Sequence, residues 1–301
     1  MKSKFKVKVL LASFNGEPWI NDQINSILNQ KNIDVSVVVS DDCSKDNTVD
    51  IAIKTAASSK LITVLPVEKQ GGAAANFFRL IRDADLSNIE YLALSDQDDI
   101  WLENKVYKAI NLIIENNVDG YSSNVTAFWA NGNQKLINKA QPQQKYDYMF
   151  ESAGPGCTFV LTKKLAANLK EFLSTNHEES KSVALHDWFI YAYARSRGYS
   201  WFIDKEPHVS YRQHDKNVVG ANIGIKAKLD RWKKMREGWH IRQAILIADI
   251  LGYSTDFPIK ELKTYNYFID RVKLIVNVRK LRRRFRDCLA LAIFFLFPKK
   301  K

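Results

Sequence analysis

Residues 92–101 read LALSDQDDIW, and this stretch decides how the rest of the chain is interpreted. Its first half is a short apolar run, and three aspartates, Asp96, Asp98 and Asp99, follow within four positions. Carboxylates this close repel one another and raise one another's pKa unless a cation lies between them. A hard divalent cation such as Mg²⁺ or Mn²⁺, shared with phosphate oxygens, suits such a group. The other interpretation is a solvated acidic turn that caps a helix starting near Trp101, since aspartate favours N-caps.

Around this stretch the chain alternates between strand patterns and helix patterns. Short apolar or β-branched runs predict strands at residues 6–12, 34–40, 61–65 and 90–94. Apolar residues at helical spacing predict helices at 17–30, 48–59, 73–84 and from about 101 to 116. The repeated strand–helix order is the signature of a doubly wound α/β sheet flanked by helices. In such a sheet ligands bind at the carboxyl ends of the strands, and each of these strands ends in a polar cluster.

The alternation loosens in the second half of the chain. We expect a strand at 121–130, a polar loop at 134–145, a Gly-Pro-Gly turn at 154–156, a strand at 157–162 and a helix from about 163. A helix at 185–198, strands at 199–203 and 208–211, and a loop through 212–214 and 217–220 follow. The motifs of common nucleotide sites are missing, because the first strand–helix turn reads SFNGEP rather than GxGxxG and no GxxxxGK[ST] occurs. The remaining possibility for a nucleotide site is a nucleotide bound through a metal ion that carboxylates hold.

Composition limits the class of protein. The 301 residues, 46% of them hydrophobic, are enough for one large domain or a domain with an appendage. The three cysteines, Cys43, Cys157 and Cys288, have no CxxC spacing, and their odd number argues against a disulfide framework and fits a reducing cytosol. The apolar run near the N-terminus is too short for a signal peptide and fits a first strand.

The net charge of +12 is unevenly distributed. Residues 1–220 carry a net charge of −1, whereas residues 221–301 carry +13. A neutral body with a basic C-terminal region suggests contact between that region and an anionic surface, either lipid or nucleic acid.

Seven segments in order resemble glycosyltransferase family 2, enzymes of the GT-A fold that transfer a sugar from a nucleotide donor. They read LASFNGEPWINDQINSILNQ, SDDCSKDNT, GGAAANF, LSDQDDIW, GPGCTFVLTKKL, HDWFIYAYA and YRQHDKNVVGA, and they cover nearly three quarters of the chain, up to about residue 221. The last two segments are most similar to bacterial polysaccharide rhamnosyltransferases, although related galactosyl- and glucosyltransferases have similar sequence segments. The resemblance implies a doubly wound mixed sheet and inversion at the anomeric carbon.

The resemblance also implies roles for the nucleotide and metal sites. Asp42, with Asp41 beside it, matches the position that reads the base and ribose, and Ser13 and Asn15 are expected to line the same pocket. The alternative for Asp42 is an N-cap of the helix at 48–59.

Asp96 and Asp98 match the DxD motif. Asp98 is the expected metal ligand, and Asp96 the expected ribose or metal contact, for Mn²⁺ or Mg²⁺. His214 is expected as a third metal ligand or diphosphate contact, with a structural histidine as the alternative, and Arg212 as a contact to the leaving phosphate. Asp99 is assigned to the surroundings of the metal site, and Trp101 is assigned to the core.

Asp187 matches the catalytic base, which takes the proton from an acceptor hydroxyl as that hydroxyl attacks the anomeric carbon. The alternative is again an N-cap, ahead of the apolar residues that follow Asp187. His186 either orients Asp187 or is satisfied locally. The turn at 154–157 is expected to shape the acceptor side, with Gly156 allowing a close approach of the backbone.

We divide the chain into a catalytic domain at 1–221, with a nucleotide half at 1–100 and an acceptor half at 101–221, and a helical basic region at 222–301. In the latter, Leu274, Val278, Leu281 and Phe285 are spaced as one helical face, and Cys288 begins ten consecutive apolar residues. Ten residues are about half of what spans a bilayer. A basic amphipathic helix before a short apolar segment fits attachment to the anionic inner face of the cell membrane, with an oligomer contact or packing on the catalytic domain as alternatives.

The leading hypothesis is a metal-dependent, inverting glycosyltransferase of bacterial cell-surface polysaccharide synthesis. Its donor would be a nucleotide-diphospho-sugar, dTDP-rhamnose being one candidate, and its acceptor a saccharide, free or lipid-linked. A hexosyltransferase that uses a UDP-sugar is the first alternative, and a sugar-phosphate nucleotidyltransferase or a non-catalytic protein that binds membrane or nucleic acid are further ones. No nucleic acid partner is expected, and a homo-oligomer is left open.

Overall fold

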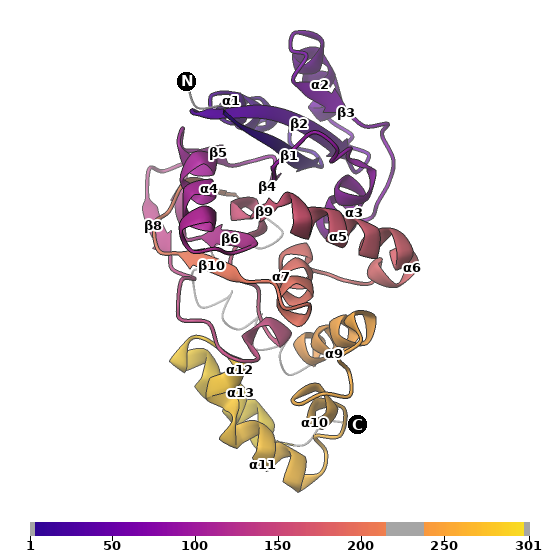
Figure 1. Cartoon of the computed structure of the whole chain (residues 1–301), viewed down its shortest axis with the longest axis vertical. Coiled ribbons are helices and arrows are strands. Elements are labelled where there is room, and N and C mark those ends of the chain that lie inside the picture. The colour runs from indigo at the N-terminus through magenta and orange to yellow at the C-terminus, as the bar shows by residue number, and fades with distance from the viewer. Residues whose placement is uncertain (1–3, 215–237, 298–301) are drawn as a thin grey trace.

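A seven-stranded mixed sheet forms the centre of the chain in the computed structural model, which describes residues 4–214 and 238–297 (Figure 1). Its strands run in the order β10-β6-β9-β4-β1-β2-β3. Their bounds are Phe5–Ser13 for β1, Ile33–Asp41 for β2, Ile62–Val64 for β3, Tyr91–Ser95 for β4, Gly120–Ser123 for β6, Val160–Thr162 for β9 and Trp201–Asp204 for β10. β9 is antiparallel to both of its neighbours, β4 and β6, and the remaining pairs are parallel. The expected doubly wound mixed sheet is therefore confirmed.

Successive residues of β1 pack on opposite faces of the sheet, because strand side chains alternate. Val7, Val9 and Leu11 belong to one buried cluster, and Leu10 and Ala12 to the other. The helices are α1 (Ile20–Leu28), α2 (Thr48–Ala57) and α4 (Lys105–Glu115) beside the first cluster, and α3 (Ala73–Asp83), α5 (Lys163–Thr175), α6 (His177–Ser180) and α7 (His186–Ser196) on the side of the second. Burial on both faces explains why these strands read as nearly continuous apolar runs.

A second, four-stranded sheet was not expected from the sequence. Its order is β5-β11-β7-β8, with β5 at Ile100–Trp101, β7 at Val125–Trp129, β8 at Gln134–Ile137 and β11 at Val209–Gln213. The strand expected at 121–130 is therefore wrong as one element, since β6 and β7 lie in different sheets. The break falls at Asn124, whose amide donates to the Lys205 carbonyl at 2.7 Å and accepts from the Lys139 N–H at 2.6 Å.

The helix expected to start near Trp101 begins later. Trp101 pairs with Val209 in β5, and α4 starts at Lys105. The Lys105 ammonium lies 3.2 Å from the centre of the Trp101 ring. The strand expected at 157–162 is likewise shorter, because a 3₁₀ turn, η2 (Gly156–Thr158), precedes β9.

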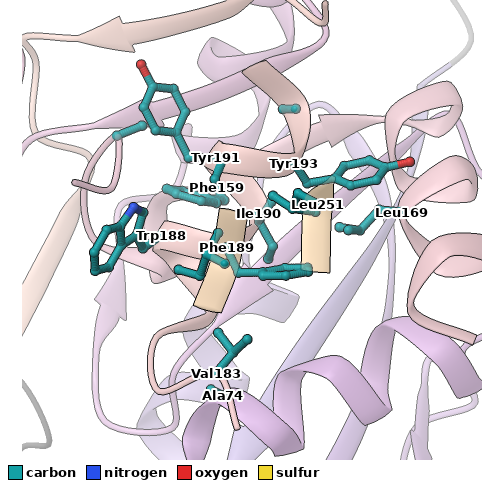
Figure 2. Packing of buried hydrophobic residues seen from close by; sticks show 14 of the residues in the cluster. Ala74, Phe159, Leu169, Val183, Trp188, Phe189, Ile190, Tyr191, Tyr193 and Leu251 are labelled. Carbon is teal, nitrogen blue, oxygen red and sulfur yellow. The ribbon is translucent and has the colours of Figure 1, made fainter. Parts of the chain in front are cut away.

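Helix α7 lies at the centre of the larger buried cluster (Figure 2). Trp188, Phe189, Ile190 and Tyr191 are all buried in consecutive positions. A helix that is apolar all around is surrounded by other elements, and here α3, α5, α9 and the 3₁₀ turn η1 (Asp147–Met149) all contact it. The residue before this run is Asp187, so the predicted base is carried on the most enclosed helix of this cluster.

The C-terminal region folds into short helices that join the same buried cluster. They are α9 (Trp239–Leu251), α10 (Ile259–Lys263), α11 (Phe268–Val276), α12 (Val278–Leu281) and α13 (Phe285–Leu296). The face expected along 274–285 is interrupted, because Arg282 and Arg284 are extended. The loop expected at 217–220 and the basic segment expected from residue 222 lie outside the described residues. None of the helices in the described ranges combines the length and the hydropathy that crossing a bilayer requires.

We predict that Gly120→Ala destabilises the fold by about 1–3 kcal/mol, the usual cost of overpacking. A Cβ at residue 120 would overlap the ring of Trp201, which is buried and donates from its indole N–H to Ser122 at 3.0 Å. Lys54→Ala, at an exposed position on α2, is the control, since it changes a side chain that contacts no buried ring among the described residues. Urea unfolding measures both variants, and an equal loss of stability in the two would contradict the prediction.

Candidate active site

A cavity of about 1690 Å³ opens at the carboxyl ends of β1, β2 and β4. Of the residues predicted for the site, it is lined by Ser13, Asn15, Asp42, Asp96, Asp98, Asp187 and His214. Asp41 and Arg212 are the two predicted residues that do not line it. The structure therefore brings together the proposed metal ligands, most of the proposed nucleotide contacts and the proposed base.

Gln97, the residue between Asp96 and Asp98, holds the turn that carries them against the loop after β1. The Gln97 amide accepts from the Phe14 N–H at 2.8 Å and donates to the Phe14 carbonyl at 2.8 Å. A Cβ on Gly16 would overlap this amide, so a glycine lets the two loops approach. The middle residue of the DxD motif thus fixes the turn, a role that its sequence position did not reveal.

Burial and mutual repulsion act on the carboxylates of this turn. Burial, with the negative charges of Asp98 and then Asp187, raises the pKa of Asp96 to about 8. Behind it, Asp99 is fully buried, and burial followed by the charges of Asp98 and Asp96 raises its pKa well above the usual range. Burial also lowers the pKa of Lys105, whose charge offsets that of Asp96, to about 7. When they are ionised these carboxylates repel one another, and the one buried ammonium of Lys105 offsets only part of that repulsion, so a bound cation would favour their ionised form.

The donor atoms fit a divalent cation. Asp96 and Asp98 offer carboxylate oxygens to the cavity, and His214 Nε2 lies 2.8 Å from Asp98 Oδ2. Carboxylates suit Mg²⁺ and Mn²⁺, and an imidazole is also a common metal ligand. Ligand atoms of Asp96, Asp99 and Cys157 also lie within 4.8 Å of one another, but Asp99 and Cys157 are fully buried and do not line the cavity. Asp96, Asp98 and His214 are therefore the set that faces the cavity.

An aromatic ring holds His214 in place. The Trp19 ring stacks on the imidazole with centroids 3.8 Å apart and an angle of 11° between the planes. The sequence indicated only that Trp19 belongs to an apolar helical pattern, whereas it stands just before α1 and lines the cavity. No signal in the sequence identifies this stacking, because the two residues are far apart in the chain.

Asp42 and Asp41 have different surroundings. The Asp42 carboxylate lines the cavity and accepts backbone N–H groups from Gln70, Gly71 at 2.9 Å and Gly72 at 2.7 Å. It thus holds the glycine turn before α3, and neither Asp41 nor Asp42 caps α2, the alternative considered from the sequence.

Asp41 is turned inward and is only 1% exposed. It accepts from the Ser13 hydroxyl at 2.7 Å and from the Ser44 hydroxyl at 2.7 Å. Asn15, at φ 48°, accepts from the Lys45 N–H at 2.9 Å. Asp41 therefore ties the loops after β1 and β2 together, and a direct nucleotide contact by Asp41 has no support in this geometry.

Arg212 also differs from its expected role. Its Nε donates to the Asp98 carbonyl at 2.9 Å, and its backbone N–H donates to Asp99 Oδ1 at 3.2 Å. The guanidinium lies 4.9 Å from the centre of the Phe128 ring. Arg212 therefore stabilises the acidic turn through these two hydrogen bonds. Its expected contact with the leaving phosphate is not supported.

Asp187 lies in the first turn of α7 and lines the cavity. Burial raises its pKa to about 6, against hydrogen bonds from the Trp188 N–H and the Ser152 hydroxyl that lower it. A carboxylate with a pKa just below neutral is mostly ionised at pH 7 and still accepts a proton readily, as a general base must. Asp187 does not act as the N-cap of α7, since that position belongs to Leu185.

His186 neither bonds Asp187 nor is satisfied by another described residue. Its ring stacks on Phe77 at 3.9 Å, its Nε2 is buried without a hydrogen-bond partner among the described residues, and burial lowers its pKa to about 3. A Cβ on Gly156 would overlap the imidazole, so the close approach expected at Gly156 is that of the His186 ring. His186 is therefore a neutral residue of the cavity wall.

Solved structures share the fold of this chain. TarS from S. aureus in complex with UDP is 18% identical, with 97% of this chain and 88% of that chain covered and a TM-score of 0.55. The mannosyltransferase PcManGT from Pyrobaculum calidifontis, in complex with GDP-Man and Mn²⁺, is 15% identical, with 98% and 86% covered and a TM-score of 0.53. Fold and site together define a sugar transferase of the GT-A class.

Sequence comparison gives the family. The family model described as glycosyl transferase family 2 matches residues 8–169. The dTDP-rhamnosyl transferase RfbG of Shigella flexneri is 43% identical over 279 residues, which are 92% of this chain and 96% of that protein. The glucosyltransferase WfgD of Escherichia coli is 27% identical over 58% of this chain and 67% of its own length. The chain belongs to glycosyltransferase family 2.

We predict that the kcat/KM of transfer falls about tenfold per pH unit below pH 6, measured at saturating metal. The reason is that Asp187 has its pKa raised to about 6 and must be ionised to accept a proton. If the unaltered protein lost its activity only below pH 5, the role of Asp187 as the base would be contradicted.

Proposed function

We propose that this glycosyltransferase transfers rhamnose from dTDP-rhamnose to a saccharide acceptor, with inversion, in the synthesis of a bacterial cell-surface polysaccharide. The observation that carries the mechanism is that the acidic turn at Asp96 and Asp98 and the carboxylate of Asp187 face one cavity. The rhamnosyl donor rests on the likeness to RfbG. The nucleotidyltransferase and non-catalytic alternatives are set aside by the family.

Each carboxylate has a separate part in this mechanism. Asp98, Asp96 and His214 would hold Mn²⁺ or Mg²⁺, which as a Lewis acid offsets the charge that develops on the departing diphosphate. Asp42 and the loops of Ser13 and Asn15 line the nucleotide side of the cavity. Asp187 takes the proton from the acceptor hydroxyl as the C–O bond to the anomeric carbon forms and the bond to the diphosphate oxygen breaks.

We further propose that the acceptor is lipid-linked and that the protein attaches to the inner face of the cell membrane. Exposed apolar side chains gather on α11 and α13, and the most exposed of them are Phe268, Ile269 and Val276 on α11 and Phe285, Leu296 and Phe297 at the two ends of α13. An excess of lysine and arginine over acidic residues surrounds them, which attracts an anionic leaflet. A contact between two copies of the chain is the alternative.

A second candidate function is hexosyl transfer from a UDP-sugar. It is favoured by the 27% identity to WfgD, a UDP-Glc-dependent β-1,3-glucosyltransferase. Screening dTDP-rhamnose, UDP-glucose and UDP-galactose with Mn²⁺ and measuring the diphosphate released distinguishes the two. Release of dTDP from dTDP-rhamnose is the expected result, and turnover of UDP-sugars alone would overturn the rhamnosyl proposal.

Two substitutions separate donor binding from chemistry. We expect Asp98→Ala to abolish Mn²⁺-dependent donor binding, measured by calorimetry, because it removes a metal ligand. Asp187→Asn keeps the shape of the side chain but not its basicity, so we expect donor affinity within about twofold of wild type and a fall in kcat of about 10²–10⁴. Full turnover by Asp187→Asn would remove this residue from the base role.

We expect Phe268→Ser with Ile269→Ser to weaken binding to phosphatidylglycerol vesicles by about tenfold or more, because two exposed apolar side chains no longer enter the bilayer. Ile53→Ser, at an exposed position on α2, is the control. Unchanged vesicle binding would contradict membrane attachment, and a shift from dimer to monomer would assign the surface to a second copy. Deleting residues 282–301 is a poorer test, because Arg283 and Phe295 are buried.

A further inference from the structure

The wall of the cavity near Asp187 is strongly basic, and part of it comes from the C-terminal region. Its basic residues are Lys135, Lys139, Arg282, Arg283, Arg284 and Arg286. Arg282, Arg283 and Arg284 stand in the segment between α12 and α13, and Arg286 lies in the first turn of α13. The segment that interrupts the expected amphipathic helix is therefore part of the active-site cavity.

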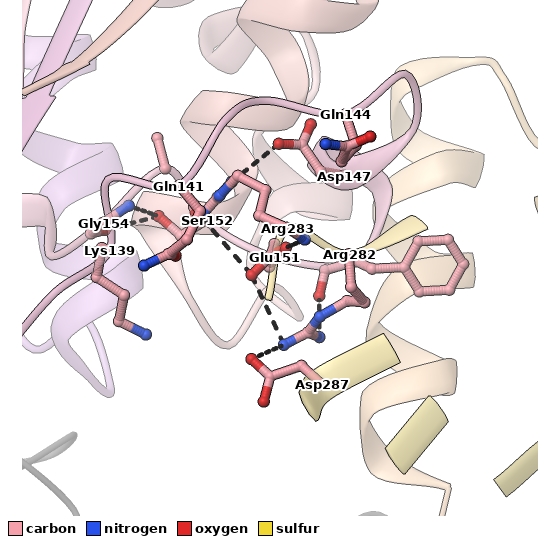
Figure 3. Close-up of polar contacts among 12 residues, drawn as sticks. Lys139, Gln141, Gln144, Asp147, Glu151, Ser152, Gly154, Arg282, Arg283 and Asp287 are labelled. Atoms are coloured by element: carbon pink, nitrogen blue, oxygen red, sulfur yellow. Dashed lines mark hydrogen bonds and ion pairs between the residues drawn. The ribbon is translucent and has the colours of Figure 1, made fainter. Parts of the chain in front are cut away.

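Two of these arginines are neutralised by the loop that they cover (Figure 3). Arg283 is 1% exposed at its side chain, forms an ion pair with the buried Asp147 at 3.0 Å and donates to the Ser152 carbonyl at 2.5 Å. Arg282 donates to the Phe150 carbonyl at 3.0 Å and lies 3.7 Å from a Glu151 carboxylate oxygen. These contacts fix the position of the segment and leave little of the two charges for a ligand.

Lys139 and Arg284 differ from that pair. Neither side chain has an ion pair or hydrogen bond to any residue within 4–214 or 238–297. Burial, followed by the charge of Arg284, lowers the pKa of Lys139, and burial followed by the charge of Arg286 lowers the pKa of Arg284. Two half-buried cations that repel each other leave a positive potential in the cavity wall, which an anion would relieve.

The start of α13 adds to this potential. Arg284 is the N-cap of this twelve-residue helix, whose N-terminus carries a partial positive charge. Exposed apolar residues then follow at one-turn spacing along α13, at Phe285, Leu289, Ile293 and Leu296. The stripe begins at the cavity, because Phe285 itself lines it. An anionic group followed by an apolar chain matches this order of charges and apolar residues.

We propose that Lys139 and Arg284, with Arg286 at the rim, bind the phosphate or diphosphate that joins the acceptor saccharide to its lipid, and that the lipid lies along the exposed stripe of α13. The proposal rests on the proposed function, whose acceptor it specifies. The acceptor hydroxyl would then be presented to Asp187, which is close enough for the charge of Lys139 to act on its carboxylate. The proposed donor side of the cavity is separate, at Asp96 and Asp98.

The test uses the full-length protein, with farnesyl diphosphate as the anionic lipid probe and farnesol as its neutral counterpart. EDTA is present so that no metal holds a diphosphate at the acidic turn. We expect Arg284→Gln and Lys139→Gln each to weaken farnesyl diphosphate binding at least tenfold in calorimetry and to leave farnesol binding within twofold. Lys260→Gln, at an exposed position on α10, removes the same charge elsewhere and serves as the control.

Three results would overturn the proposal. They are unchanged affinity for farnesyl diphosphate in both variants, an equal loss of farnesol binding, or an equal loss in Lys260→Gln. Phosphatidylglycerol vesicles distinguish the source of the phosphate: variants that lose vesicle binding but keep farnesyl diphosphate affinity would assign the cations to bilayer headgroups. Turnover of dTDP-rhamnose is measured separately, so failure of the donor assignment and failure of this site give different results.

Discussion

Repulsion among the carboxylates at the end of β4 is the constraint on which the site depends. Asp96, Asp98 and Asp99 occupy one turn with little access to water, and the pKa of Asp96 rises to about 8 as a result. A turn of this kind loses stability as its charges accumulate, so the surrounding residues must hold it in place. Gln97 does so through two hydrogen bonds to Phe14, and Arg212 does so from the opposite side through the Asp98 carbonyl. In the proposed mechanism a divalent cation with a diphosphate would remove this repulsion, so donor binding would be coupled to its relief.

The two ends of the cavity differ in the sign of the charged side chains that line them. At the end with Asp96 and Asp98, carboxylates gather, and their ionised form would be favoured by a cation. At the other end, positive charge from Lys139 and Arg284 is in excess, and between them Asp187 keeps a pKa of about 6, because burial raises it while Lys139 and two hydrogen bonds lower it. The intermediate pKa of Asp187 therefore results from its burial and from the positive charge of Lys139 beside it, and it suits the proposed role of a base.

The first half of the fold follows from local patterns, whereas much of the site does not. β1, β2 and β4 have β-branched and apolar runs, and the structure places them within one or two residues of their predicted bounds. The acidic turn could be named from its closely spaced carboxylates, and Asp187 from the resemblance of its segment to the family. Trp19 stacking on His214 and Asp41 bonding Ser13 and Ser44 could not, since such pairs depend on how distant segments meet. The break between α12 and α13 was missed for the same reason: periodicity favours a continuous helix, but Arg283 reaches Asp147 only from an extended backbone.

The ion pair between Arg283 and Asp147 has a consequence for how such enzymes diversify. Because it joins the C-terminal helices to the loop before the Gly-Pro-Gly turn, those two segments form one mechanical unit even though more than a hundred residues separate them in the chain. Exchange of the C-terminal helices alone between relatives would leave the buried Asp147 with Arg195, at 3.3 Å, and without Arg283. Segments 139–154 and 238–297 should therefore be inherited together, while the nucleotide-binding half remains free to change its sugar donor.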